Sequence, residues 1–174
     1  MTLTFVALLV RLLAAAVASL SFSILFHVPR RHLPIVTVCA TLTYFIFYVV
    51  LELHGSNFSA ALISTLFTAL FAGFAARTRR APTIVFLIPC IIPTVPGASL
   101  YNTMHHAISG NWEAATTHLR VALEISLGIA GGILLVSALF NMVLDYLAKR
   151  KAAVQDTATA SSKVQKPDAD NVTK

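Results

Sequence analysis

Long apolar runs alternate with short polar segments along this chain. Each run reaches the length of about 20 residues that a transmembrane helix needs. The runs are rich in Leu, Ile, Val, Ala and Phe, and charged residues gather between them rather than within them. The pattern predicts five membrane-spanning helices, at about residues 3–28, 33–53, 58–76, 82–103 and 117–147.

The fourth run cannot form one continuous helix. It contains Pro89, followed by the stretch Pro93-Thr94-Val95-Pro96-Gly97. Each proline removes a backbone donor and clashes with the preceding turn. Backbone groups freed inside a bilayer are tolerated only against protein or a water-filled cavity. The sequence therefore predicts an all-α membrane protein, a five-helix transmembrane bundle whose fourth helix is broken.

Small residues at helical spacing predict close helix contacts. Ala69 and Gly73 lie one turn apart in the third run, and Gly128 and Gly132 form a GxxxG pair in the last. Such faces allow two membrane helices to approach closely. A gating hinge is the alternative for the glycine pair.

Basic clusters between the runs predict the orientation. The net charge of +6 by itself suggests a nucleic-acid partner, but most basic residues flank the apolar runs, so we expect no nucleic acid. Cytoplasmic loops of membrane proteins are rich in Lys and Arg. With five spans all clusters fall on one side, which predicts an N-terminus outside and a cytoplasmic C-terminus; a four-span chain with a re-entrant fourth segment would divide them. The clusters are Arg30 and Arg31; Arg77, Arg79 and Arg80; and Lys149, Arg150 and Lys151.

Composition agrees with a membrane domain and gives little support to an enzyme. The chain is 57% hydrophobic and only 11% charged, which is too apolar for an ordinary soluble domain. We predict a transmembrane domain over residues 1–148 and a disordered cytoplasmic tail over 149–174. Cys39 and Cys90 lie within apolar runs, and the adjacent His105 and His106 do not share a helical face with each other. We therefore expect no metal, no cofactor and no catalysis.

Two charged residues lie at the depth of the break. With a rise of about 1.5 Å per residue, Gly97 is roughly 22 Å from the inner edge, while Arg11 is roughly 12 Å and Glu124 roughly 10 Å from the outer edge. Charges at such depths usually face a bundle interior or a cavity. We expect Arg11 and Glu124 to approach each other or a substrate there. Alternatively, both reach back to the outer interface, and Glu124 pairs with Arg120 one turn away.

The break also has a polarity of its own. The half-helix that begins near Gly97 offers free N–H groups and the positive end of a helix dipole, which favour an anion. Ser99, Tyr101 and Asn102 could add hydrogen bonds, although helix capping and an interfacial tyrosine explain them equally well. The candidate substrate-binding residues are therefore Pro93, Pro96, Gly97, Ser99, Tyr101, Asn102, Arg11 and Glu124.

The proline-glycine stretch, followed by Tyr101 and Met104, resembles the threonine/serine exporter family. More closely, it is similar to the short subunit of the split, two-component members. The likeness extends from Phe26 to about Ile108 and includes the Val28-Pro29-Arg30-Arg31 segment. The chain departs from the expected pattern at residues 40–44, where we expect more glycine.

The resemblance implies an exporter in the bacterial inner (plasma) membrane. Its substrates would be small carboxylate-bearing metabolites, either amino acids such as threonine and serine or dicarboxylates, driven by an ion gradient. It also implies a longer membrane subunit of the same family as partner, in a hetero-oligomer; a homo-oligomer stays open. The alternative is a scaffold protein that stabilises a transporter partner without contacting substrate.

Overall fold

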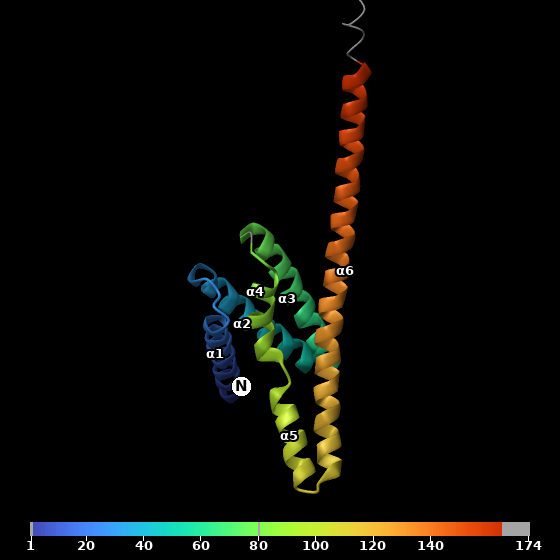
Figure 1. Cartoon of the computed structure of the whole chain (residues 1–174). Coiled ribbons are helices and arrows are strands. Elements are labelled where there is room, and N and C mark those ends of the chain that lie inside the picture. The colour runs from blue at the N-terminus through green and yellow to red at the C-terminus, as the bar shows by residue number, and fades with distance from the viewer. Residues whose placement is uncertain (1, 80, 165–174) are drawn as a thin grey trace, which may run out of the picture. The chain divides into compact units, whose positions relative to one another are not determined.

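The computed structural model describes residues 2–79 and 81–164, and within them every regular element is helical (Figure 1). In chain order the elements are α1 (Thr2–Leu25), η1 (Arg30–His32), α2 (Leu33–His54), α3 (Asn57–Arg79), α4 (Ile84–Ile91), η2 (Ile92–Thr94), α5 (Gly97–Ile108) and α6 (Trp112–Val164).

Four stretches are long and apolar enough to cross a membrane, and a fifth span arises if the bent pair counts as one. The four lie in α1, in η1 with α2, in α3 and in the first part of α6. The pair consists of α4 with η2 and of α5, which are bent by 48° at the break. The predicted all-α membrane fold with a broken fourth helix is confirmed.

The chain divides into two compact units, Met1–Val136 and Ser137–Lys174, with the boundary inside α6. Helix α6 continues to Val164, beyond the end of the transmembrane domain predicted at residue 148, and a disordered cytoplasmic tail over 149–174 stays a prediction. Residues 149–164 contain several alanines and no glycine or proline, and alanine has the highest helix propensity. Residues 165–174 lie outside the described part of the chain.

Helix α2 is the centre of the first unit, where it packs against α1, α3 and α4. Small side chains allow this close approach, and they surround one large ring, that of Phe86 in α4. Because Phe86 and its neighbour Cys90 are both completely buried, α4 is an integral part of the core. The buried cluster consists of Val36, Cys39, Ala40, Ala72, Ala75, Ala76, Phe86 and Cys90.

The glycine pair of α6 lies directly against α3. A Cβ atom added to Gly128 would lie 2.7 Å from the Cβ of Ala61 and from the carbonyl oxygen of Phe58. One added to Gly132 would lie 2.8 Å from the Cβ of Thr65. The close helix packing predicted from the GxxxG spacing is therefore confirmed.

The first unit carries its basic connections at one end. Within this unit as drawn in Figure 1, the α1–α2 and α3–α4 connections lie toward the upper end, and the α5–α6 connection lies at the lower end. Arg30, Arg31 and Arg79 are exposed at the first of these ends. This clustering agrees with the charge asymmetry in the sequence.

Candidate functional site

The break begins where α4 runs into prolines. Pro89 lies inside α4, and η2 tightens the helix before it ends. The Thr94 hydroxyl donates to the carbonyl of Ile91 at 2.7 Å, which satisfies one freed carbonyl. Val95 is then extended (φ −61°, ψ 133°) and Pro96 turns the chain (φ −78°, ψ 48°) into α5. The break is therefore a short non-helical link between two helices.

The start of α5 leaves two backbone amides free. The Gly97 amide donates to the carbonyl of Val95 at 2.8 Å, and the Leu100 amide donates to that of Pro96 at 3.0 Å. Pro96 provides no side-chain cap. In the described part of the chain, no hydrogen bond uses the amides of Ala98 or Ser99. Two free N–H groups at a helix N-terminus form a site suited to a carboxylate or another anion.

A cavity of about 260 Å³ lies beside the break. Three alanines of α1 form one wall, and their small side chains leave the cavity open. Arg11 contributes a positive charge and Tyr44 contributes an aromatic ring. Pro93 belongs to η2, so the cavity adjoins the break. The lining residues are Arg11, Ala14, Ala15, Ala18, Tyr44 and Pro93. The structure thus brings Arg11 and Pro93, two of the predicted site residues, to one cavity.

Arg11 rests on a second aromatic residue of α2. Its guanidinium carbon lies 5.7 Å from the centre of the Tyr48 ring, within the range of a cation–π contact. The sequence reasoning assigned no role to Tyr44 or Tyr48. Their spacing of four residues was the available signal, because it places both rings on one face of a helix.

Glu124 contacts residues of α6 and α3 rather than Arg11. Its carboxylate accepts a hydrogen bond from Arg120 at 3.0 Å, one helical turn away, and another from the Asn57 amide at 3.3 Å. The local pair with Arg120 was the alternative open in the sequence. Arg11 and Glu124 therefore have different neighbours in this structure. A role for Glu124 in binding substrate stays a prediction.

The remaining predicted residues lie along α5, in which no residue is buried. Ser99 and Asn102 are partly buried, while Tyr101 is 69% exposed. The Tyr101 ring stacks on His105 at a centroid distance of 6.2 Å. This half of the broken span is thus only partly covered by the described residues, and Tyr101 and His105 are among its exposed side chains.

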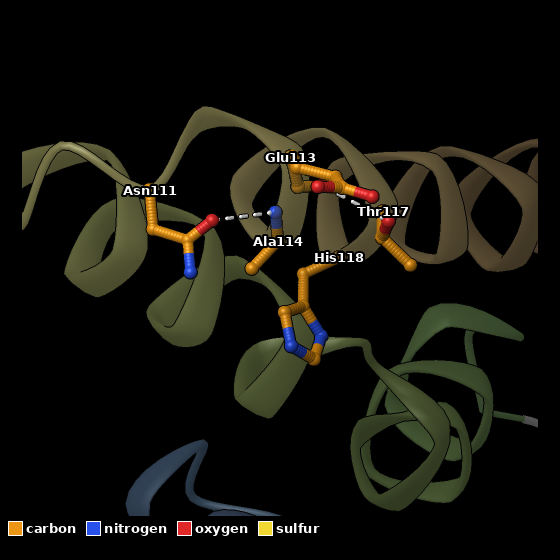
Figure 2. A pocket seen from close by; sticks show the side chains of 5 residues that line it. All are labelled: Asn111, Glu113, Ala114, Thr117 and His118. Atoms are coloured by element: carbon orange, nitrogen blue, oxygen red, sulfur yellow. Dashed lines mark hydrogen bonds between the residues drawn. The ribbon is translucent and has the colours of Figure 1, made fainter.

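A second pocket, of about 350 Å³, lies at the turn between α5 and α6 (Figure 2). Its hydrogen bonds are those of a helix start: the Asn111 side-chain oxygen accepts from the Ala114 amide at 3.2 Å, and the Thr117 hydroxyl donates to the carbonyl of Glu113 at 3.0 Å. The His118 ring stacks in parallel on His106, with centroids 5.4 Å apart. Among the described residues, no group of three His, Cys, Asp or Glu side chains could hold a metal ion.

A multi-pass helical protein with a discontinuous span beside a charged cavity has the architecture of a secondary transporter. A family model described as "Threonine/Serine exporter, ThrE" matches residues 11–139, and the chain belongs to this family. It is a membrane transporter of the threonine/serine exporter type, as the resemblance of the sequence predicted. Neither the curated proteins nor the solved structures gave a match.

Proposed function

We propose that this chain is the short subunit of a two-component exporter in the bacterial inner membrane. Together with a longer subunit of the same family, it moves small carboxylate-bearing metabolites out of the cell: threonine- or serine-like amino acids, or dicarboxylates. The N-terminus lies outside, the C-terminus lies in the cytoplasm, and an ion gradient drives export.

The free amides at the start of α5 are the observation that carries this proposal. A carboxylate can accept hydrogen bonds from the Ala98 and Ser99 amides, and the helix dipole adds to their attraction. Arg11, from the cavity beside Pro93, supplies a positive charge near the same break. Tyr101 and Asn102 follow in the next turn of α5 and are available for the rest of the substrate.

The exposed side of α5 supports the need for a partner. Its two free amides cannot face lipid, because the hydrocarbon region offers no acceptor. Leu100, Met104 and Ile108 are also exposed, Ile108 to 85%. A neighbouring subunit that covers α5 would bury these side chains and enclose the anion site within protein.

Gly97→Ala tests the site without disturbing the fold. A Cβ atom at this position meets no atom within 4 Å, and the backbone does not require glycine. We expect normal assembly but export lowered at least about tenfold, because a displaced carboxylate loses charge-assisted hydrogen bonds of about 1.5 kcal/mol or more. Efflux of labelled threonine, serine and dicarboxylates from cells expressing both subunits is the measurement.

Gly131→Ala is the matched control. It makes the same change in α6, where the new Cβ would lie 3.2 Å from the end of the flexible Leu62 side chain. We expect export close to that of the wild type. If Gly97→Ala and Arg11→Gln both assemble and export at the wild-type rate, the substrate does not use this site, and the chain is the scaffold of the alternative.

A further inference from the structure

A groove of about 210 Å³ lies between α2 and α3, away from the break. Its wall is apolar, and Thr78 and Arg79 at the end of α3 give it one polar end. The lining residues are Ile35, Phe71, Phe74, Ala75, Thr78 and Arg79. An apolar wall with a single basic end matches the polarity of a phospholipid, whose acyl chain leads to a charged headgroup.

A buried histidine brings a second arginine to the same end. His32 is 1% exposed and packs edge-on against the Phe86 ring at 5.2 Å. Its Nε2 accepts a hydrogen bond from Arg31 Nε at 3.1 Å, which holds the guanidinium in place. Ile35, four residues after Arg31, lines the groove together with Arg79. Arg31 in η1 and Arg79 in α3 therefore both lie toward the same end of the groove.

This positive charge is not balanced by the described part of the protein. The salt bridge found there joins Arg120 and Glu124, so neither Arg31 nor Arg79 has a carboxylate partner among the described residues. In addition, His32 Nδ1 is buried without a hydrogen-bond partner in that part of the chain. An external anion would pair with the exposed Arg31 and Arg79.

We infer that the groove binds an anionic phospholipid. Its acyl chain lies along Phe71 and Phe74, and its phosphate lies between Arg31 and Arg79. Arginine suits this role because its planar fork can donate two hydrogen bonds to one phosphate. The two arginines also lie at the end that carries the basic connections, which attracts anionic headgroups in the cytoplasmic leaflet. The lipid would tie the start of α2 to the end of α3.

Lipid binding to the purified full-length protein tests this inference. We expect native mass spectrometry to show retained phosphatidylglycerol in preference to phosphatidylcholine, and thermal unfolding to shift upward with phosphatidylglycerol alone. Arg31→Gln and Arg79→Gln should each weaken phosphatidylglycerol binding about fivefold, the effect of one basic residue near an anionic surface. Phe71→Ala should weaken lipid binding as well, because it removes part of the apolar wall.

Arg30→Gln is the matched control, because it removes the same charge from the neighbouring exposed position and should have a smaller effect. An equal loss in all three arginine variants would mean diffuse attraction and overturn the site. Displacement of the lipid by millimolar inorganic phosphate would show that the arginines bind a free anion, and this result would also overturn the phospholipid site. If a variant does not fold, the wild-type preference between the two lipids still decides, and equal retention of both refutes the inference.

Discussion

Thr43 and Thr68 place two hydroxyl oxygens 2.6 Å apart in the contact between α2 and α3, where both side chains are fully buried. Each hydroxyl also lies 2.9 Å from a carbonyl of its own helix, that of Cys39 or of Ser64. Two hydroxyl protons are therefore available for three short oxygen–oxygen contacts, the one between the threonines and the two to the carbonyls. One threonine donates to the other, and this contact joins two helices in a region where other polar partners are scarce.

We expect Thr68→Val to lower the free energy of unfolding by about 1 kcal/mol, because it leaves the Thr43 hydroxyl without its cross-helix partner. The double variant with Thr43→Val should lose less than the sum of the single changes, since no hydroxyl is then left over. Unfolding of the purified protein in mixed detergent micelles measures both. Thr37→Val is the control, because the Thr37 hydroxyl donates to the Leu33 carbonyl of its own helix. Strictly additive losses would contradict the coupling.

The charged residues show which features of a site can be predicted from sequence position and helical rise. Helical rise placed Arg11 near the depth of the break, and the structure gives it a cavity that Pro93 also lines. The neighbours of Glu124 could not be fixed in this way. Depth does not give the direction of a side chain around the helix axis, and Asn57 of α3 approaches Glu124 from another helix.

At the scale of elements, the contact between α3 and α6 leaves little room for a larger side chain. The Gly128 backbone lies so close to Ala61 and Phe58 that an added methyl group would overlap their atoms. The neighbouring Gly131 faces only the end of a leucine side chain. The same substitution to alanine is therefore expected to disturb packing at Gly128 much more than at Gly131.

Gly128→Ala should lower the free energy of unfolding by about 1–3 kcal/mol, because the helices must separate to relieve the overlap. Gly131→Ala should change it by less than about 1 kcal/mol, since the leucine can move and alanine favours the helix. Thermal unfolding of the two variants side by side measures the difference. Equal stability of both would argue against the close α3–α6 contact.

The elements were predictable to the extent that their signals are local. Proline chemistry at Pro93 and Pro96 acts within one turn, so the break was visible in the sequence. The bend of 48° was not, because it depends on how Phe86 and its neighbours hold α4 in the core. The extension of α6 to Val164 was missed because polar composition was given more weight than helix propensity.

At the scale of the whole molecule, the family indicates the function, and the distribution of basic residues predicts the orientation in the membrane. Membership of the threonine/serine exporter family rests on residues 11–139, and the sequence anticipated it from the proline-glycine stretch. Neither a partner nor a substrate can be derived from one chain by packing rules. The predicted orientation in the membrane rests on the basic connections alone and is open to a direct test.

Single cysteines in the connections report the orientation. We expect Ser56→Cys and Ser109→Cys to react with a membrane-impermeant thiol reagent from outside intact cells, and Thr78→Cys to react only after the cells are opened. All three positions are exposed, and the native Cys39 and Cys90 are buried, so background labelling should be low. Labelling of position 109 from the inside would instead indicate four spans and a re-entrant fourth segment.

The two halves of the broken span are held very differently. Phe86, Pro89 and Cys90 fasten α4 into the core, whereas no residue of α5 is buried. We expect backbone amides of α5 to exchange hydrogen with solvent faster than those of α4 in the purified chain, and comparable rates would argue otherwise. Faster exchange in α5 would make the non-helical link at Val95 and Pro96 a hinge, about which α5 moves while α4 stays fixed in the core.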